Sequence, residues 1–268
     1  MPILLHHADQ SKRLLWLLEE LRLPYELRKG GPEKDNSVAS TSVAGTASST
    51  SSSSTSTTPE QTTNSGSSQS SIYDTIAQAV ASSLSGALPP THSPTIVDNG
   101  LTVRESGAIV EYLIEKYGKG RFTPSTPSSK LDNTFFMHYA EGSFMPPLVL
   151  KQVFSTIYEK SPFFVRPFTS IVTSQICKSF IDPANFNNFS LVDGYLSRDG
   201  GRQFLAGGKE PTGGDFMMSF PIESAVTCGA FKPEEIPQSM KDYLDRLRAR
   251  PAYTRVEEML KKQAEAKL

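Results

Sequence analysis

An acid–hydroxyl pair stands at the start of a predicted helix in the middle of the chain. Glu105 and Ser106 precede apolar residues at helical spacing, Ile109, Leu113 and Tyr117. The backbone N–H groups at a helix N-terminus bind anions, and a serine hydroxyl adds one more donor. The pair could therefore hold a ligand that carries both a carboxylate and an ammonium group. The alternative is a capped helix that binds nothing.

A Ser-Pro dipeptide opens the apolar run that precedes this pair. Pro94 is followed by a short strand at residues 95–97, and Asp98-Asn99-Gly100 then predicts a tight hairpin into a second strand at 101–103. A proline at the head of an inner strand is costly unless the backbone there has another use. One such use is a cis bond that turns the backbone of Ser93 outward, where a peptide can pair with it.

The N-terminus predicts a strand, a helix and a second strand. Residues 2–6 form a short apolar run, residues 10–23 carry a leucine stripe at helical spacing, and residues 25–28 read as a strand. This order is typical of a parallel βαβ unit. Ser11 supplies a hydroxyl at the helix N-terminus, where serine most often serves only as the N-cap.

Composition limits the classes of function. The chain has 268 residues, enough for two ordinary domains, and a net charge of −1, which gives no electrostatic case for nucleic acid or an anionic membrane surface. No apolar run approaches the roughly 20 residues that span a bilayer. Cys177 and Cys228 are isolated, and His6 and His7 would point to opposite faces of a strand, so no metal site is predicted.

Changes in composition divide the chain. Residues 1–118 predict an α/β domain, interrupted at about 33–71 by a Ser/Thr-rich insertion that we expect to be disordered. Residues 119–129 are dense in Gly, Pro and Ser and read as a linker. Residues 130–268 predict only helices, among them one that begins with a capping box at Thr212 and Asp215.

Five motifs recur in this order in one family. They are RLLWLLEEL, SPTIVDNG, the ES-AI-EYL pattern, YAEGS followed by PPL, and the GGDFMMSFP segment. With them the chain resembles glutathione transferases of the yeast and filamentous-fungal branch, over nearly its whole length except the insertion. The resemblance implies an α/β thioredoxin-like N-terminal domain followed by an all-α C-terminal domain, and a homodimer.

The resemblance also implies roles for particular residues. Ser11 would be the catalytic hydroxyl that stabilises the glutathione thiolate. Six residues would bind glutathione, the co-substrate: Arg13, His92, Ser93, Pro94, Glu105 and Ser106. Three on the long helix would contact the electrophile: Tyr139, Ser143 and Phe144. The sequence departs from the family in two places, because only Lys12 separates Ser11 from Arg13 and because His92 replaces a basic residue.

The expected function is conjugation of the glutathione thiolate to a small, hydrophobic electrophile, without a metal, in detoxification or the stress response. Two alternatives stay open: a transferase-fold protein that binds or regulates without catalysis, and a glutathione-dependent peroxidase or reductase. The expected location is cytoplasmic. The final Ala266-Lys267-Leu268 is a close variant of a peroxisomal address and gives an alternative.

Overall fold

The computed structural model describes residues 2–7, 11–29, 94–227 and 231–265. The Ser/Thr-rich insertion at about 33–71, Cys228 and the C-terminal tripeptide 266–268 lie outside the described residues.

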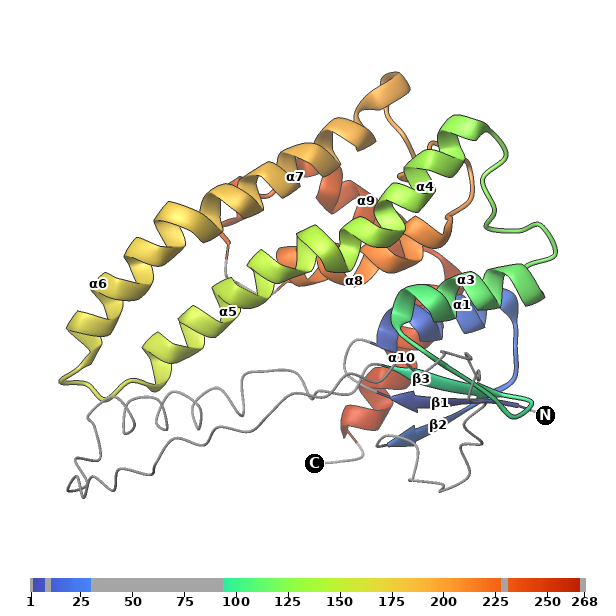
Figure 1. Cartoon of the computed structure of the whole chain (residues 1–268), viewed down its shortest axis with the longest axis horizontal. Helices are drawn as coiled ribbons and strands as arrows, with labels where there is room; N and C mark the ends of the chain where they lie inside the picture. Colours follow the sequence, from blue (N-terminus) through green and yellow to red (C-terminus); the bar gives the residue numbers. More distant parts are fainter. Residues whose placement is uncertain (1, 8–10, 30–93, 228–230, 266–268) are drawn as a thin grey trace, which may run out of the picture.

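A four-stranded mixed sheet forms the N-terminal part (Figure 1). Its strands are β1 (Ile3–His7), β2 (Tyr25–Lys29), β3 (Thr95–Asp98) and β4 (Leu101–Arg104), in the order β2-β1-β3-β4. β1 and β2 are parallel and are joined through α1 (Lys12–Leu21), which confirms the predicted βαβ unit. β3 runs antiparallel to both β1 and β4.

The hairpin between β3 and β4 turns at the predicted residues. Asn99 and Gly100 both have positive φ, 48° and 86°. Two successive positive values are what a two-residue hairpin turn of type I′ requires, and Asn-Gly is its preferred sequence. The turn fixes the register that pairs Thr95 with Arg104 and so places the residues after β4 beside the start of β3.

Helices make up the rest of the described chain. α3 (Ser106–Tyr117) follows β4 and packs with α1 near the sheet. The helical part contains α4 (Pro127–Tyr139), α5 (Met145–Lys160), α6 (Arg166–Ile176), α7 (Asp182–Leu196), α8 (Gly213–Thr227), α9 (Gln238–Arg248) and α10 (Pro251–Glu265). Figure 1 shows α4 with α5, and α6 with α7, as two long rods. This arrangement confirms the predicted thioredoxin-like domain followed by an all-helical part.

A π-helical turn joins the two helices of each rod. One spans Ala140–Phe144 and the other spans Cys177–Ile181. The first turn ends just before Pro146 and Pro147, near the start of α5, which have no backbone N–H and so cannot donate helical hydrogen bonds back into the turn. Such turns insert one extra residue and are frequent at functional sites.

α8 is the central helix of the helical part, and its start is fixed by a buried carboxylate. Asp215 has no exposed surface and accepts hydrogen bonds from four donors: Leu205 N, Thr212 N, Thr212 Oγ1 and the Tyr243 hydroxyl. Burial raises the pKa of Asp215, and the four donors oppose that shift. The predicted capping box is thus present in modified form, because the Thr212 hydroxyl donates to the carboxylate.

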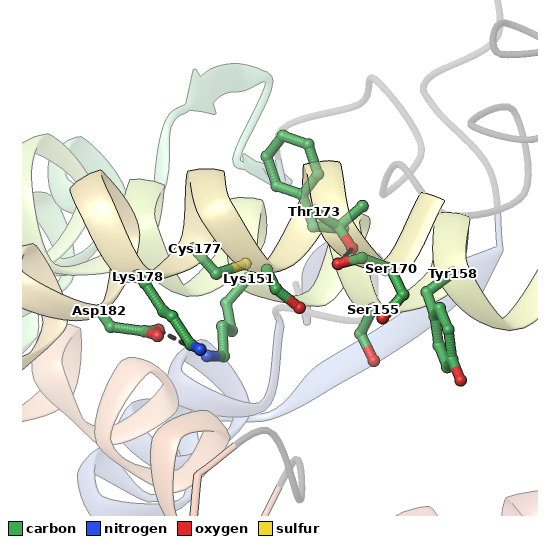
Figure 2. Close-up of a pocket in the computed structure, with 10 residues that line it drawn as sticks. Lys151, Ser155, Tyr158, Ser170, Thr173, Cys177, Lys178 and Asp182 are labelled. Atoms are coloured by element: carbon green, nitrogen blue, oxygen red, sulfur yellow. Dashed lines mark hydrogen bonds and ion pairs between the residues drawn. The ribbon is translucent and has the colours of Figure 1, made fainter. Parts of the chain in front are cut away.

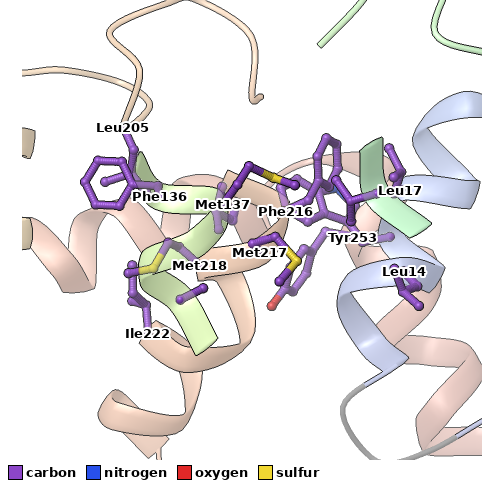
Figure 3. Packing of buried hydrophobic residues seen from close by; sticks show 14 of the residues in the cluster. Leu14, Leu17, Phe136, Met137, Leu205, Phe216, Met217, Met218, Ile222 and Tyr253 are labelled. Atoms are coloured by element: carbon purple, nitrogen blue, oxygen red, sulfur yellow. The ribbon is translucent and has the colours of Figure 1, made fainter. Parts of the chain in front are cut away.

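The core is continuous from the sheet helices into the helical part (Figure 3). Leu14 and Leu17 of α1, Phe136 of α4 and Phe216 of α8 have no exposed surface. A side chain at Gly214 would place its Cβ 2.9 Å from the Phe136 Cβ, so glycine is needed where α8 crosses α4. None of the helices in the described ranges is long and apolar enough to cross a membrane.

A polar cluster at the end of β3 ties the hairpin to α3. Asp98 is 2% exposed and accepts hydrogen bonds from the Tyr112 hydroxyl at 2.7 Å, the Tyr117 hydroxyl at 2.5 Å and Lys116 Nζ at 2.8 Å. Burial alone would raise the pKa of Asp98, but the three donors outweigh it and hold the pKa below its ordinary value. The ionised carboxylate therefore stabilises the folded state above the ordinary pKa.

We expect Asp98→Asn to lower the free energy of unfolding at pH 7 by about 1–3 kcal/mol, because a buried charge-assisted acceptor is lost. The difference from the parent protein should shrink as the pH falls toward and below about 4, where the parent carboxylate takes up a proton. Urea unfolding at pH 7 and at acidic pH measures this difference, with Asp245→Asn, at an exposed position of α9, as control. A difference that stays constant with pH would contradict this assignment.

Candidate active site

Three chain segments with chemically useful residues meet at one edge of the sheet. β1 ends at His7, β3 begins at Thr95 and β4 ends at Arg104, and the register pairs His6 with Thr95 and Thr95 with Arg104. Adjacent strands lie about 4.8 Å apart, so these three strand ends fit within about 10 Å. Because α1 follows β1 and α3 follows β4, two helix N-termini lie at the same edge. Unpaired N–H groups there favour an anionic ligand.

Ser11 marks the first of these helix N-termini. It is fully buried, stands in right-handed helical conformation with φ −74° and ψ −7°, and makes no capping hydrogen bond to the helix backbone. A serine that serves as an N-cap normally has extended φ/ψ and accepts from an N–H two or three residues on. The geometry therefore does not match the interpretation of Ser11 as a simple cap.

Glu105 and Ser106 lie at the second of these helix N-termini, that of α3. Glu105 has φ 71° and ψ 128°, a left-handed region that is unfavourable for a residue with a side chain. Its carbonyl oxygen still accepts from Ile109 N at 2.9 Å, which begins α3. Backbone strain of this kind costs about 1–3 kcal/mol and is concentrated at binding sites. Ser106 is 6% exposed, whereas Glu105 is exposed.

Arg13 joins the sheet part to the helical part. Its side chain is 1% exposed, and Nη1 lies 2.5 Å from Glu141 Oε1, in the first π-helical turn. The guanidinium also lies over the ring of Phe220. Burial lowers the pKa of Arg13, while Glu141 opposes that shift. Among the described residues, the buried Nε and Nη2 of Arg13 have no hydrogen-bond partner.

Lys12 makes a second connection from α1. Its Nζ lies 2.6 Å from Glu223 of α8 and 2.9 Å from Glu257 of α10, above the ring of Tyr253. Burial alone would raise the pKa of Glu223, but Lys12 and Arg248 outweigh it and hold that pKa below its ordinary value. Both residues on the C-terminal side of Ser11 are thus fixed by carboxylates of the helical part.

The three residues expected to contact an electrophile lie in different environments. Tyr139 is half-buried and donates to Asn188 Oδ1 at 2.6 Å, and Asn188 donates in turn to the backbone oxygen of Ser143 at 3.0 Å. Burial raises the pKa of the Tyr139 hydroxyl. Ser143 is exposed, whereas Phe144 is fully buried and packs on Phe189. Phe144 is therefore a core residue in this structure, and Tyr139 connects α4 to α7.

Two predicted ligand residues, His92 and Ser93, lie outside the described residues, as does the peptide bond that precedes Pro94. Among the described residues, the structure brings Pro94, Glu105, Ser106 and Ser11 to the same sheet edge. Sequence reasoning missed Glu141, since nothing local marks a partner that lies 128 residues from Arg13. The part of the chain that the structure describes holds no group of three residues arranged to bind a metal ion.

Comparisons with known proteins agree with this arrangement. No protein-family model matches the sequence. Glutathione S-transferase 3 of Schizosaccharomyces pombe is 27% identical over 227 residues, which are 83% of this chain and 74% of that protein. Glutathione S-transferase 1 of Saccharomyces cerevisiae is 28% identical over 139 residues, which are 51% of this chain and 58% of that protein.

The fold is shared with solved structures. The glutathione transferase URE2P6 from Phanerochaete chrysosporium, in complex with oxidized glutathione, superposes with a TM-score of 0.59 at 17% identity. The superposition covers 97% of this chain and 96% of that one. This identity is low, so the likeness establishes the fold.

The Arg13–Glu141 pair leads to an asymmetric prediction. Glu141→Gln leaves a buried guanidinium without its counter-charge, so we expect the free energy of unfolding to fall by about 2–4 kcal/mol. Arg13→Met leaves a carboxylate whose side chain is 44% exposed and can be hydrated, so the loss should be at most about 1 kcal/mol. Urea unfolding of both variants measures the two values, and an equal or reversed order would refute the stated role of burial.

Proposed function

We propose that this chain, which has the fold of the glutathione transferases and resembles the yeast enzymes in sequence, is itself a glutathione transferase. It conjugates the glutathione thiolate to a small hydrophobic electrophile. The observation that carries the proposal is the convergence of Ser11, Pro94 and the strained Glu105-Ser106 pair at one sheet edge, beside two helix N-termini. The low identity to the relatives is why the activity is stated as a proposal.

The sheet edge would hold glutathione as an extended peptide. Glu105 would bind the ammonium group of the γ-glutamyl end, and Ser106 with the N–H groups of α3 would bind its carboxylate. The backbone of Ser93, next to Pro94, would pair with the cysteinyl unit. His92 would donate to the glycine carboxylate at the other end.

Ser11 would act on the sulfur. A free thiol titrates near 8.5, so a hydroxyl donor and the positive end of α1 are needed to favour the thiolate at neutral pH. The thiolate then attacks the electrophile, a C–S bond forms, and a leaving group departs with the electron pair of its bond. Arg13, fixed by Glu141, is a positioning residue in this scheme, because it holds the start of α1 against the helical part.

The electrophile would lie between the sheet edge and the first π-helical turn. Of the three residues expected there, the exposed Ser143 remains a candidate contact and Tyr139 a weaker one, since its hydroxyl is already bonded to Asn188. We do not propose Phe144, because its ring packs on Phe189 within the hydrophobic core. A homodimer belongs to the proposal on the family likeness alone.

A non-catalytic binding protein is the second candidate. One observation favours it: Lys12 and Arg13, directly after Ser11, are both held by carboxylates of the helical part, which limits how far Ser11 can be moved toward a ligand. Such a protein would bind glutathione in a calorimetric titration and show no conjugation of chlorodinitrobenzene. Conjugation above the uncatalysed rate excludes this candidate.

Glu105→Ala and Ser106→Ala should each weaken glutathione binding. Loss of one charge-assisted hydrogen bond contributes about 1.5–3 kcal/mol, which corresponds to at least about a tenfold rise in the dissociation constant. Calorimetric titration measures it, with Glu111→Ala, on the exposed face of α3, as control. If both variants bind as the parent does, glutathione does not occupy this edge.

Ser11→Ala should lower kcat for conjugation by about tenfold or more, with a smaller change in glutathione affinity, because its hydroxyl acts on the thiolate rather than on the peptide. The bound thiol should also titrate at higher pH, which thiolate absorbance measures. Ser190→Ala, on the exposed face of α7, is the matched control. An unchanged rate together with an unchanged thiol titration would assign Ser11 a structural role only.

A further inference from the structure

Four arginines line one cavity at the junction between α1 and the helical part. They are Arg22, Arg121, Arg250 and Arg255, and the cavity has a volume of about 440 Å³. Its wall consists of the end of α1, the linker at Arg121 and the start of α10. Small-molecule sites typically measure about 300–1,000 Å³, so the volume suits a small ligand. This space is named the arginine cavity below.

The arginine cavity lies at the end of α1 opposite to the proposed glutathione site. Ser11 precedes the first residue of α1 and Arg22 follows the last, and the helix between them has 10 residues. At a rise of 1.5 Å per residue, the two ends of the helix are about 15 Å apart. The arginine cavity is therefore separate from the sheet edge, and nothing in the proposed function requires it.

Two glutamates in the last turn of α1 also line the arginine cavity, and both carboxylates are already engaged. Glu20 is 8% exposed and accepts hydrogen bonds from Trp16 Nε1 at 3.0 Å and from Arg250 Nε at 2.5 Å. Glu19 accepts from Arg255 Nε at 2.7 Å. These acids fix the positions of two arginines and leave the rest of each guanidinium group uncommitted.

The arginines offer more donors than the glutamates accept. Each guanidinium group has five N–H donors. In the described part of the chain, the exposed Arg22 side chain has no hydrogen-bond partner and no ion-pair partner. The Arg255 side chain is 51% exposed and reaches Glu19 through Nε, while Arg121 Nη1 donates to the backbone oxygen of Glu20. Several N–H groups around the arginine cavity are thus left for a ligand.

The charge balance of the arginine cavity is positive. Besides Glu19 and Glu20, one further acid lies within 4 Å of these arginines among the described residues, Glu210, which is 3.0 Å from Arg250 Nη2. Four guanidinium groups therefore face three carboxylates, although the whole chain has a net charge of −1. Arginine stays protonated at physiological pH, so the excess is permanent. The complementary ligand is an anion.

The helix ends at the arginine cavity do not decide this preference. Pro251 and Ala252 begin α10, whose positive dipole end favours an anion. Glu19 and Glu20 belong to the last turn of α1, whose negative dipole end opposes it. Because the two ends have opposite signs, the arginine side chains determine which ligand the cavity selects.

The cavity in the α5–α6 hairpin provides a contrast (Figure 2). It measures about 310 Å³, and Lys151, Lys178 and Asp182 lie together on its wall. An adjoining cavity shares these three residues and adds Glu235. Two bases therefore meet two acids, and Lys151 Nζ already lies 2.5 Å from Asp182 Oδ1. No excess charge selects a ligand there, unlike in the arginine cavity.

A phosphate group fits the arginine cavity better than a carboxylate does. The planar guanidinium fork pairs with two oxygens of one anion, and this geometry makes arginine the preferred partner of phosphate. A phosphate monoester has three acceptor oxygens and a charge of about −1.5 to −2 at pH 7, so it can pair with more than one arginine at once. A carboxylate has two oxygens and one charge.

We propose that the arginine cavity binds a small molecule through a phosphate or pyrophosphate group. Arg22 from the end of α1 and Arg255 from α10 hold the anion from opposite sides, since their guanidinium groups have the most free donors. Arg121 and Arg250, which are fixed by Glu20, add positive charge to the wall. The inference goes beyond the proposed function and does not depend on it.

Calorimetric titration of the full chain with inorganic pyrophosphate tests the proposal. The parent should bind pyrophosphate at physiological ionic strength, and the melting temperature should rise with the pyrophosphate concentration, because the site exists only in the folded state. Arg22→Gln with Arg255→Gln should raise the dissociation constant about tenfold or more. Together these two side chains make one exposed ion pair, so we expect the double variant to fold as the parent does.

A matched control removes the same charge elsewhere. Arg166→Gln with Lys178→Gln takes two exposed bases from α6 and the π-helical turn after it, and it should bind pyrophosphate as the parent does. Three results would overturn the proposal: no heat and no rise in melting temperature for the parent, parent-like binding by the Arg22 and Arg255 double variant, or equally tight binding of succinate. The last would identify a surface that attracts any anion.

The sheet edge is the other place where an anion could bind. Ser106→Ala removes a donor there and should leave the affinity for pyrophosphate unchanged, whereas a loss would place pyrophosphate at that edge and overturn the proposal. A chain that binds pyrophosphate but neither binds nor conjugates glutathione would refute the transferase and leave the arginine cavity intact. A chain that conjugates glutathione and never binds pyrophosphate would do the reverse.

Discussion

The packing of Trp16 is the interaction on which the arrangement of this molecule depends. Trp16 has no exposed surface, and its ring lies 4.3 Å from that of Phe216 and 5.3 Å from that of Tyr253, measured between centroids. Its Nε1 donates to Glu20 at 3.0 Å, so the polar atom is satisfied within the same helix. Since α1 belongs to the sheet part while α8 and α10 belong to the helical part, this one ring joins both. The position of Ser11 is therefore set by residues more than 200 positions away.

Ion pairs fix the register of α1 against the helical part. Glu20 of α1 meets Arg250, with the shortest distance 2.5 Å, just as Arg13 meets Glu141 and Lys12 meets Glu223. Pairs that are largely buried contribute little net stability, because desolvation of both charges offsets their attraction. Their effect is on geometry: a shift of α1 by one residue would leave several buried charges unmatched. The helix N-terminus at the proposed sulfur site is held in one register for this reason.

In the α5–α6 hairpin, the polar face of a helix is buried and its apolar face is exposed. Elsewhere the helices turn apolar faces toward one another, as α8 does against α4. On α6 the hydroxyl-bearing face lies against α5, and Phe168 and Ile171 lie outward. Helix propensity and mean hydropathy do not depend on which face of a helix is buried. They therefore do not distinguish a helix with a buried apolar face from one with an exposed apolar face. The two orientations of α6 differ only in which of its faces contacts α5.

Local sequence patterns are sufficient to predict the strands and helices and their order along the chain. Asn99-Gly100 predicted the hairpin, and the leucine stripe predicted the buried face of α1, because turn chemistry and periodicity are local properties. Local patterns do not predict which partner each charge takes, that Phe144 lies in the core, or that Phe168 and Ile171 of α6 are exposed. These features follow from the packing of the whole chain. Contacts between residues 100 or more positions apart leave no local pattern, so they arise only when the chain is packed. The strained backbone of Glu105 belongs to the same class, because the paired strands and α3 impose it from both sides.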